Sequence, residues 1–138
     1  MNIFEQYLAT IKELIIKNAK KLEIDNINAL DSVTIEIPPD KFDYDLSCNI
    51  AMVLAKANKK KPELLARSIQ SLLLNDLKSF SKIDIAGPGF LNINFKNEAL
   101  TNLINKILKE KANYGSNLKD NKYNLEFVSA NPTGPMHV

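Results

Sequence analysis

The sequence has one cysteine, Cys48, and one histidine, His137, among its 138 residues. A single cysteine excludes an internal disulfide framework, and a single histidine excludes a histidine-rich metal site. Its apolar runs are short, as at Leu72–Leu74, and runs of this length cannot span a bilayer. The excess of positive charge is only +2, so charge alone does not indicate a nucleic-acid partner.

The composition is that of an ordinary globular protein, with 45% hydrophobic and 25% charged residues. A chain of this length can bury a core without disulfides or metals. We expect no signal peptide, because Met1 leads directly into an amphipathic pattern that contains Glu5 and Glu13. The sequence therefore predicts a cytoplasmic protein that has no membrane segment and no metal site.

Hydrophobic periodicity predicts both helices and strands in the first 115 residues. Apolar steps of three and four residues indicate helices, and alternation of apolar with polar residues indicates strands. The order predicts an α+β fold, in which helices pack on one face of a small, mostly antiparallel sheet. The predicted helices cover residues 2–22, 46–58, 62–75 and a segment capped by Asn97; the predicted strands cover 33–37, 83–86 and 90–95, with a turn at Gly87-Pro88-Gly89 between the last two.

Two local expectations follow from these patterns. Cys48 falls on the second predicted helix, where we interpret it as a small buried residue and not as a nucleophile. The last helix is expected to bury one apolar face and to stop near Gly115. That face consists of Leu100, Leu103, Ile104, Ile107 and Leu108.

The chain is predicted to divide unevenly into domains. Residues 1–115 form the first domain, and the polar segment 116–122 reads as a linker. In residues 123–138, a further alternating strand leads into a turn-rich segment that does not fit the pattern of the first domain. We therefore expect residues 123–138 to be the truncated opening of a second domain.

The predicted strand 90–95 has an unusual outer face. Its core face would carry the aliphatic residues and Phe95, which leaves Phe90, Asn92 and Asn94 on the opposite face. Amides can hydrogen-bond to base edges, and an aromatic ring can stack on an unpaired base. The alternative is that Phe90 lies beneath a loop and that the asparagines are ordinary surface residues.

Lysines recur in two regions of the sequence. Lysine is a point charge that suits phosphate contacts without reading a base sequence. The alternative is an ordinary solvated surface, and the pattern alone favours that interpretation. The lysines concerned are Lys56, Lys59, Lys60, Lys61, Lys106, Lys109, Lys111, Lys119 and Lys122.

The segment from Glu126 to Val138 could bind a phosphate. Pro132, Gly134 and Pro135 make a rigid turn with one permissive position. A strand that feeds such a turn and then a helix would direct backbone amides and a histidine at a bound phosphate. The alternative is a turn-rich tail.

The stretch Glu126-Phe-Val-Ser-Ala-Asn-Pro-Thr-Gly-Pro-Met-His-Val138 resembles the start of the catalytic domain of the arginyl-tRNA synthetases, which are class I aminoacyl-tRNA synthetases. Residues 43–56 and 86–92 resemble stretches of the N-terminal additional domain of that family. The resemblance spans the chain in family order. It implies that residues 123–128 are the first strand of a truncated Rossmann-like, nucleotide-binding domain.

The resemblance also implies an activity and its residues. The family joins arginine to its tRNA by way of an arginyl-adenylate made from ATP, with Mg²⁺. Glu126 and Asn131 match the positions that contact arginine, for which a carboxylate is a suitable partner. His137 matches a catalytic histidine of the ATP signature. The signature residues present are Ala130, Asn131, Pro132, Thr133, Gly134, Pro135, Met136, His137 and Val138.

In the family, the additional domain contacts the D-loop at the outer corner of the tRNA. The resemblance implies that Phe90 stacks on a D-loop base and that Asn92 hydrogen-bonds to the edge of that base. We expect the partners to be tRNA, arginine and ATP, and we expect a monomer. This chain alone should bind no cofactor and should be catalytically inactive. The alternative is a protein-interaction module that uses the Phe90 face and has no RNA role.

Overall fold

The computed structural model describes residues 3–39, 41–116 and 124–125. It confirms the α+β class, with a four-stranded antiparallel sheet of strand order β1-β2-β4-β3. The strands are β1 (Ile35–Glu36), β2 (Leu46–Cys48), β3 (Phe80–Ala86) and β4 (Phe90–Phe95). The helices are α1 (Ile3–Lys17), α2 (Ile50–Ala57), α3 (Pro62–Asp76) and α4 (Asn97–Glu110), with short 3-10 turns at Asn28–Ser32 and Lys111–Asn113.

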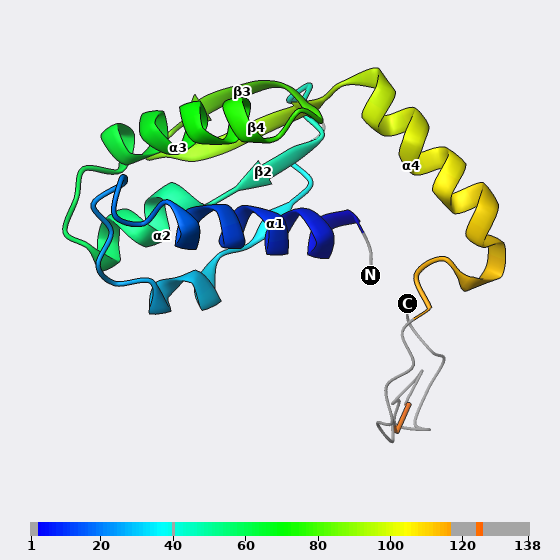
Figure 1. Ribbon diagram of the computed structural model, residues 1–138, viewed down its shortest axis with the longest axis horizontal. Helices are drawn as coiled ribbons and strands as arrows, with labels where there is room; N and C mark the ends of the chain where they lie inside the picture. The colour runs from blue at the N-terminus through cyan, green and yellow to red at the C-terminus, as the bar shows by residue number, and fades with distance from the viewer. Residues whose placement is uncertain (1–2, 40, 117–123, 126–138) are drawn as a thin grey trace, which may run out of the picture.

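The core lies between the sheet and three of the helices. Helices α1, α2 and α3 bury aliphatic residues in one cluster with the inner face of β4. In Figure 1 these three helices lie alongside the sheet, and α4 projects away from its end. None of the described helices is long and apolar enough to cross a membrane.

Helix α1 is shorter than the predicted 2–22. It ends at Lys17, and the Asn18 side chain donates a hydrogen bond from Nδ2 to the carbonyl oxygen of Leu14. Asparagine at a helix end favours such side-chain contacts over continued helix. The chain then turns, with Glu23 at a φ of 53°, yet Leu22 still reaches the core.

Strand β2 was missed, because residues 46–58 were predicted to be one helix. Residues Leu46–Cys48 are paired with β4, where Leu46 lies opposite Ile93 and Cys48 lies opposite Leu91. The helix begins only at Ile50. A short apolar run next to an apolar helix pattern is ambiguous by periodicity, and the pairing with β4 decides it. Cys48 is buried as predicted, but it lies on a strand.

Helix α4 forms as predicted, but its apolar face is not buried within the described residues. Ile104 is 55% exposed and Leu108 is 65% exposed. Only the start of α4, through Ala99 and Leu100, packs against the core. The helix begins at Asn97 with Lys96 as its cap residue, and it ends before Gly115, where Lys111 has a φ of 50°.

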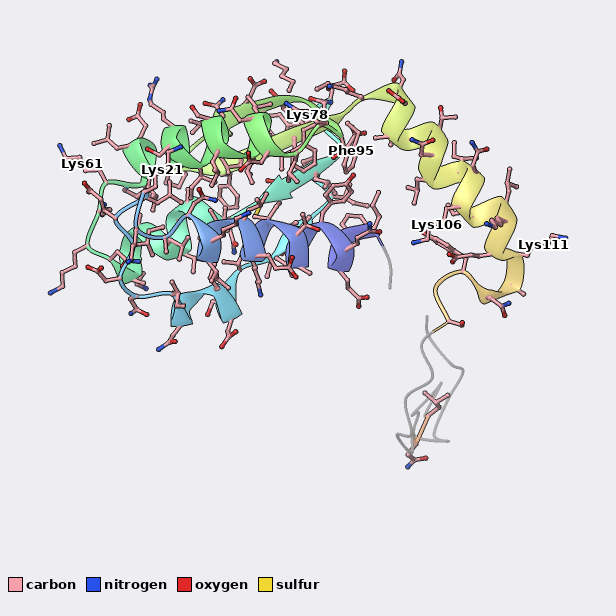
Figure 2. All side chains as sticks on the ribbon, in the orientation of Figure 1. Lys21, Lys61, Lys78, Phe95, Lys106 and Lys111 are labelled. Carbon is pink, nitrogen blue, oxygen red and sulfur yellow. The ribbon has the colours of Figure 1, made fainter. Side chains whose placement is uncertain are left out.

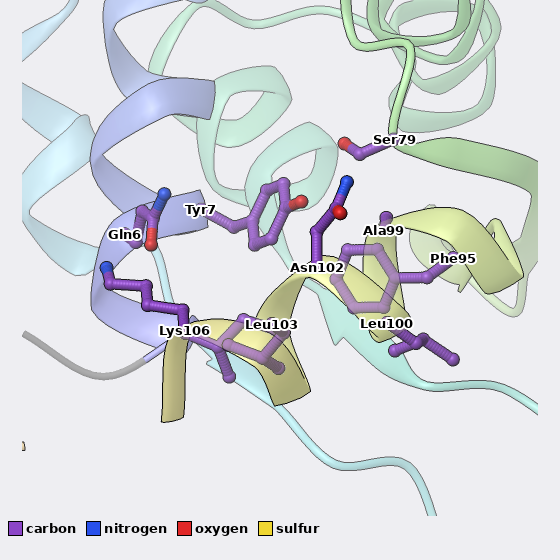
Figure 3. A pocket seen from close by; sticks show the side chains of 10 residues that line it. Gln6, Tyr7, Ser79, Phe95, Ala99, Leu100, Asn102, Leu103 and Lys106 are labelled. Carbon is purple, nitrogen blue, oxygen red and sulfur yellow. The ribbon is translucent and has the colours of Figure 1, made fainter. Parts of the chain in front are cut away.

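The junction of α1 with the start of α4 holds a hollow of about 270 Å³. Figure 3 shows Tyr7 and Phe95 beside it, together with Leu103 of α4. The two rings are 4.8 Å apart between centroids, which is a favourable aromatic distance. The aromatic contact anchors β4 to α1, and β4 then leads directly into α4.

Candidate functional site

The predicted alternation along β4 is confirmed at its centre. Leu91 and Ile93 are completely buried on the inner face, together with most of Phe95. Phe90 lies at the start of the strand and remains 38% exposed. Asn92 is on the outer face, as predicted, but only 7% of its surface is exposed. It is therefore a buried amide in an outer hollow and not a simple surface residue.

We call this depression the outer-face hollow. It has a volume of about 550 Å³ and lies where β2, β4 and the turn after β3 meet the loop that follows β1. A volume in this range suits a small ring system. Ser47 and Asn92 supply polar groups. The apolar lining includes Ile37, Pro38, Pro39, Phe42, Pro88 and Phe90.

The register of the sheet produces the polar part of the hollow. Ser47 of β2 lies opposite Asn92 of β4, and its Oγ donates a hydrogen bond of 2.8 Å to Asn92 Oδ1. Within the described residues, Asn92 Nδ2 makes no hydrogen bond. An amide whose oxygen is occupied still has two N–H groups to donate. Asn92 therefore offers hydrogen-bond donors to a partner that carries an acceptor.

Asn94, the other amide predicted for this face, has a structural partner. Its Nδ2 donates a 3.0 Å hydrogen bond to the carbonyl oxygen of Asp43. Asp45 acts nearby, because its Oδ2 accepts a 2.7 Å hydrogen bond from the backbone N–H of Phe95. Both contacts attach the loop after β1 to β4. The loop in turn contributes Phe42 to the outer-face hollow.

A carboxylate next to Asn92 has its charge balanced locally. Asp84 of β3 lies opposite Asn92 in the register. The ammonium of Lys82 lies 2.5 Å from Asp84 Oδ2, and the Tyr44 hydroxyl donates a 2.6 Å hydrogen bond to the same oxygen. The bonds from Lys82 and Tyr44 lower the pKa of Asp84, and the bond to Asp84 raises the pKa of Tyr44.

The turn between β3 and β4 depends on its glycines. Gly87 has a φ of 52° and Gly89 a φ of 119°, which side chains rarely allow. A Cβ at Gly89 would also lie 3.3 Å from the Cβ of Pro62 at the start of α3. The turn is therefore held against α3, and Phe90 follows it directly.

The described part of the chain holds neither a metal-ligand cluster nor a reactive thiol. There, no three histidine, cysteine, aspartate or glutamate side chains gather as a metal site would require. Burial raises the pKa of the Cys48 thiol to about 11, so its reactive thiolate is scarce at neutral pH. Glu126, Asn131 and His137 lie outside the described residues, as do the other signature residues from 130 to 138.

The fold is that of a small α+β domain, and the outer-face hollow has the size and the hydrogen-bond donors to suit a flat ring with an acceptor. Residues 9–95 match the family described as the arginyl tRNA synthetase N terminal domain. The chain belongs to that family.

Curated relatives extend the match to the whole chain. It is 46% identical over 140 residues to an arginine–tRNA ligase of Pelagibacter ubique, 41% identical over 140 residues to one of Bacillus pumilus, and 38% identical over 144 residues to one of Listeria monocytogenes. Each alignment covers 100% of this chain. The chain spans about a quarter of the length of these relatives, 24% of the first and 25% of the other two.

Proposed function

We propose that this chain is the N-terminal part of an arginine–tRNA ligase and that its α+β domain binds tRNA through the outer-face hollow. The observation that carries the proposal is the meeting of Phe90 and Asn92 at one hollow, in a chain that belongs to this family. The two side chains offer an apolar ring and free amide donors. Unpaired bases in RNA loops are recognised by stacking and by hydrogen bonds to their edges.

In this proposal a base of the tRNA D-loop enters the hollow. The base stacks on Phe90 and is enclosed by the proline-containing loop. Asn92 donates from Nδ2 to an acceptor on the base edge, since Ser47 already occupies its oxygen. The carboxylate of Asp84 does not repel the RNA strongly, because Lys82 balances its charge.

The remaining site residues are proposed for the complete ligase. Glu126 and Asn131 bind arginine, and the signature from Ala130 to Val138 binds ATP with Mg²⁺, with His137 as a catalytic residue. The ligase acts as a monomer in the cytoplasm. This chain alone binds no cofactor and gives no arginine-dependent ATP–pyrophosphate exchange. An exchange signal from the purified chain would overturn that part of the proposal.

A pair of asparagines provides a matched test of the tRNA site. Gel-shift titrations compare Asn92→Ala with Asn94→Ala, using transcripts of an arginine tRNA that differ at single D-loop bases. Loss of one hydrogen bond to RNA is worth about 1 kcal/mol, so Asn92→Ala should weaken binding roughly fivefold. It should also reduce the preference between D-loop variants.

Asn94→Ala should leave the base preference unchanged, because its amide bonds to Asp43; any loosening of the loop that carries Phe42 should lower the affinity for all D-loop variants by the same factor. Equal losses of base preference in both variants, with both still folded by circular dichroism, would count against Asn92 as the base-contacting residue. If the unmodified chain does not bind the transcript at low salt, tRNA binding by this domain is excluded. The protein-interaction alternative then becomes the better reading of the hollow.

A further inference from the structure

The loop between α2 and α3 contains three consecutive lysines, Lys59, Lys60 and Lys61, which we call the lysine loop. Lys60 is tied down: its Nζ lies 2.8 Å from Glu23 Oε2 and donates a 3.1 Å hydrogen bond to the carbonyl oxygen of Leu22. The other two lysines are exposed. Neither has an acidic partner within 4 Å in the described part of the chain.

The backbone of the lysine loop explains why Lys60 has an acidic partner and why Lys59 and Lys61 have none among the residues that the structure describes. Lys59 has a φ of 52°, which reverses the chain after α2. The Lys60 N–H then bonds to the carbonyl oxygen of Ala55 at 2.9 Å. These constraints hold Lys60 against the segment that follows α1. Lys59 and Lys61 are left as two uncompensated positive charges on a fixed loop.

The lysine loop adjoins the turn that precedes Phe90. Pro62 follows Lys61 directly, and it is the residue that Gly89 approaches so closely. Figure 2 shows Lys61 at the end of the domain opposite Phe95 and Lys111. Lys21 and Lys61 also line one surface hollow of about 470 Å³. The turn therefore separates the outer-face hollow from a basic surface.

We propose that Lys59 and Lys61 bind the sugar–phosphate backbone of the RNA whose base occupies the outer-face hollow. This inference rests on the proposed tRNA-binding function. The hollow has a largely apolar lining whose one charged residue is the acidic Glu36, so it suits a base better than a phosphate. A base in the hollow leaves its phosphates outside, and the lysine loop, which meets the turn before Phe90 through Pro62, carries two ammonium groups with no acidic partner among the described residues. Lysine contacts of this kind position RNA without reading its sequence.

The salt dependence of RNA binding tests the proposal. Each phosphate contact that a lysine makes contributes about 1 to the slope of log Kobs against log salt concentration. We expect the double variant Lys59→Gln/Lys61→Gln to bind the arginine tRNA transcript with a slope smaller by about 2. Its affinity should fall by the same factor for transcripts that differ at D-loop bases.

The matched control is Lys109→Gln/Lys111→Gln. It removes the same charge, and Lys111, like Lys59, has a positive φ after a helix end. We expect this control to leave the slope nearly unchanged. Equal slope reductions in the two double variants would show a general charge effect and would overturn the proposal.

Phe90→Ala separates the proposed backbone contact of the lysine loop from the proposed binding of a base in the outer-face hollow. It should lower the affinity and leave the salt slope unchanged, since it removes stacking and no charge. If Phe90→Ala weakens binding while the lysine-loop variant retains both slope and affinity, the backbone contact fails and the proposed function stands. If the unmodified chain binds no tRNA at low salt, both fail.

Discussion

The two faces of β4 differ in what their residues contribute. On the inner face, Leu91 and Ile93 are completely buried in the core. On the outer face, Phe90 and Asn92 line a hollow. Neighbouring residues on a strand point to opposite faces. Under the proposed function, residues for stability and residues for binding therefore alternate along one short strand, and adjacent substitutions should give different phenotypes.

The largest expected effect is on the inner face. Leu91→Ala removes a fully buried side chain, and such changes cost about 2–5 kcal/mol of unfolding free energy. Urea denaturation followed by circular dichroism measures the change. Phe90→Ala, one residue earlier, provides the control. If both variants lost the same stability, the division between the two faces would be wrong.

Cys48 extends the comparison to β2, because it lies opposite Leu91 on the inner face. Its pKa, raised from 9.0 to about 11 by burial, lowers the thiolate fraction about hundredfold at neutral pH. We therefore expect iodoacetamide to modify Cys48 only slowly in the folded protein and quickly in urea. Mass spectrometry measures the rate. Rapid labelling without denaturant would show that the inner face is accessible to the reagent and would contradict the burial of Cys48.

Ser47 tests the outer face of the same strand, with a smaller effect. Its hydroxyl fixes the Asn92 amide, and a typical hydrogen bond contributes about 1 kcal/mol to stability. Ser47→Ala should cost about that amount in urea denaturation and should also weaken the preference between D-loop bases. Ser47→Thr, which keeps the hydroxyl, should restore the preference. An unchanged preference in Ser47→Ala would exclude a positioning role.

The smallest effect concerns the cluster of Lys82, Asp84 and Tyr44. Because the folded state lowers the pKa of Asp84, its interactions stabilise the fold above the pKa of the unfolded carboxyl. That contribution is lost as the pH falls through the lowered folded value. Asp84→Asn should therefore lower stability slightly at neutral pH and make little difference in strong acid. If the stability difference between Asp84→Asn and the unmodified protein were larger in acid than at neutral pH, this prediction would be wrong.

Sequence reasoning predicted β4 well because its alternation is strong and the turn Gly87-Pro88-Gly89 marks its start. It placed Phe90 and Asn92 on one face correctly. It missed β2, whose pairing joins residues 45 positions apart, as in the bond from Ser47 to Asn92. Local periodicity does not contain that contact, so the burial of Asn92 and the orientation of its amide were not predictable.

Helix α4 and the lysine loop also have patterns that are visible in the sequence, but the sequence does not predict what lies next to them in the fold. Periodicity identified the apolar face of α4, but it does not state what covers that face, and Ile104 and Leu108 are exposed. The run of lysines was visible in the sequence. Its position beside the turn before Phe90 depends on the contact of Gly89 with Pro62, which only the folded chain reveals.

The most direct test of the account measures two properties of Phe90→Ala in parallel. One is the unfolding free energy, and the other is the affinity for an arginine tRNA transcript. We predict an affinity loss of about 1–3 kcal/mol, the typical value of a stacked base, with stability within about 0.5 kcal/mol. Leu108→Ala, another exposed apolar residue, should change neither. Unchanged tRNA affinity in folded Phe90→Ala would contradict the account.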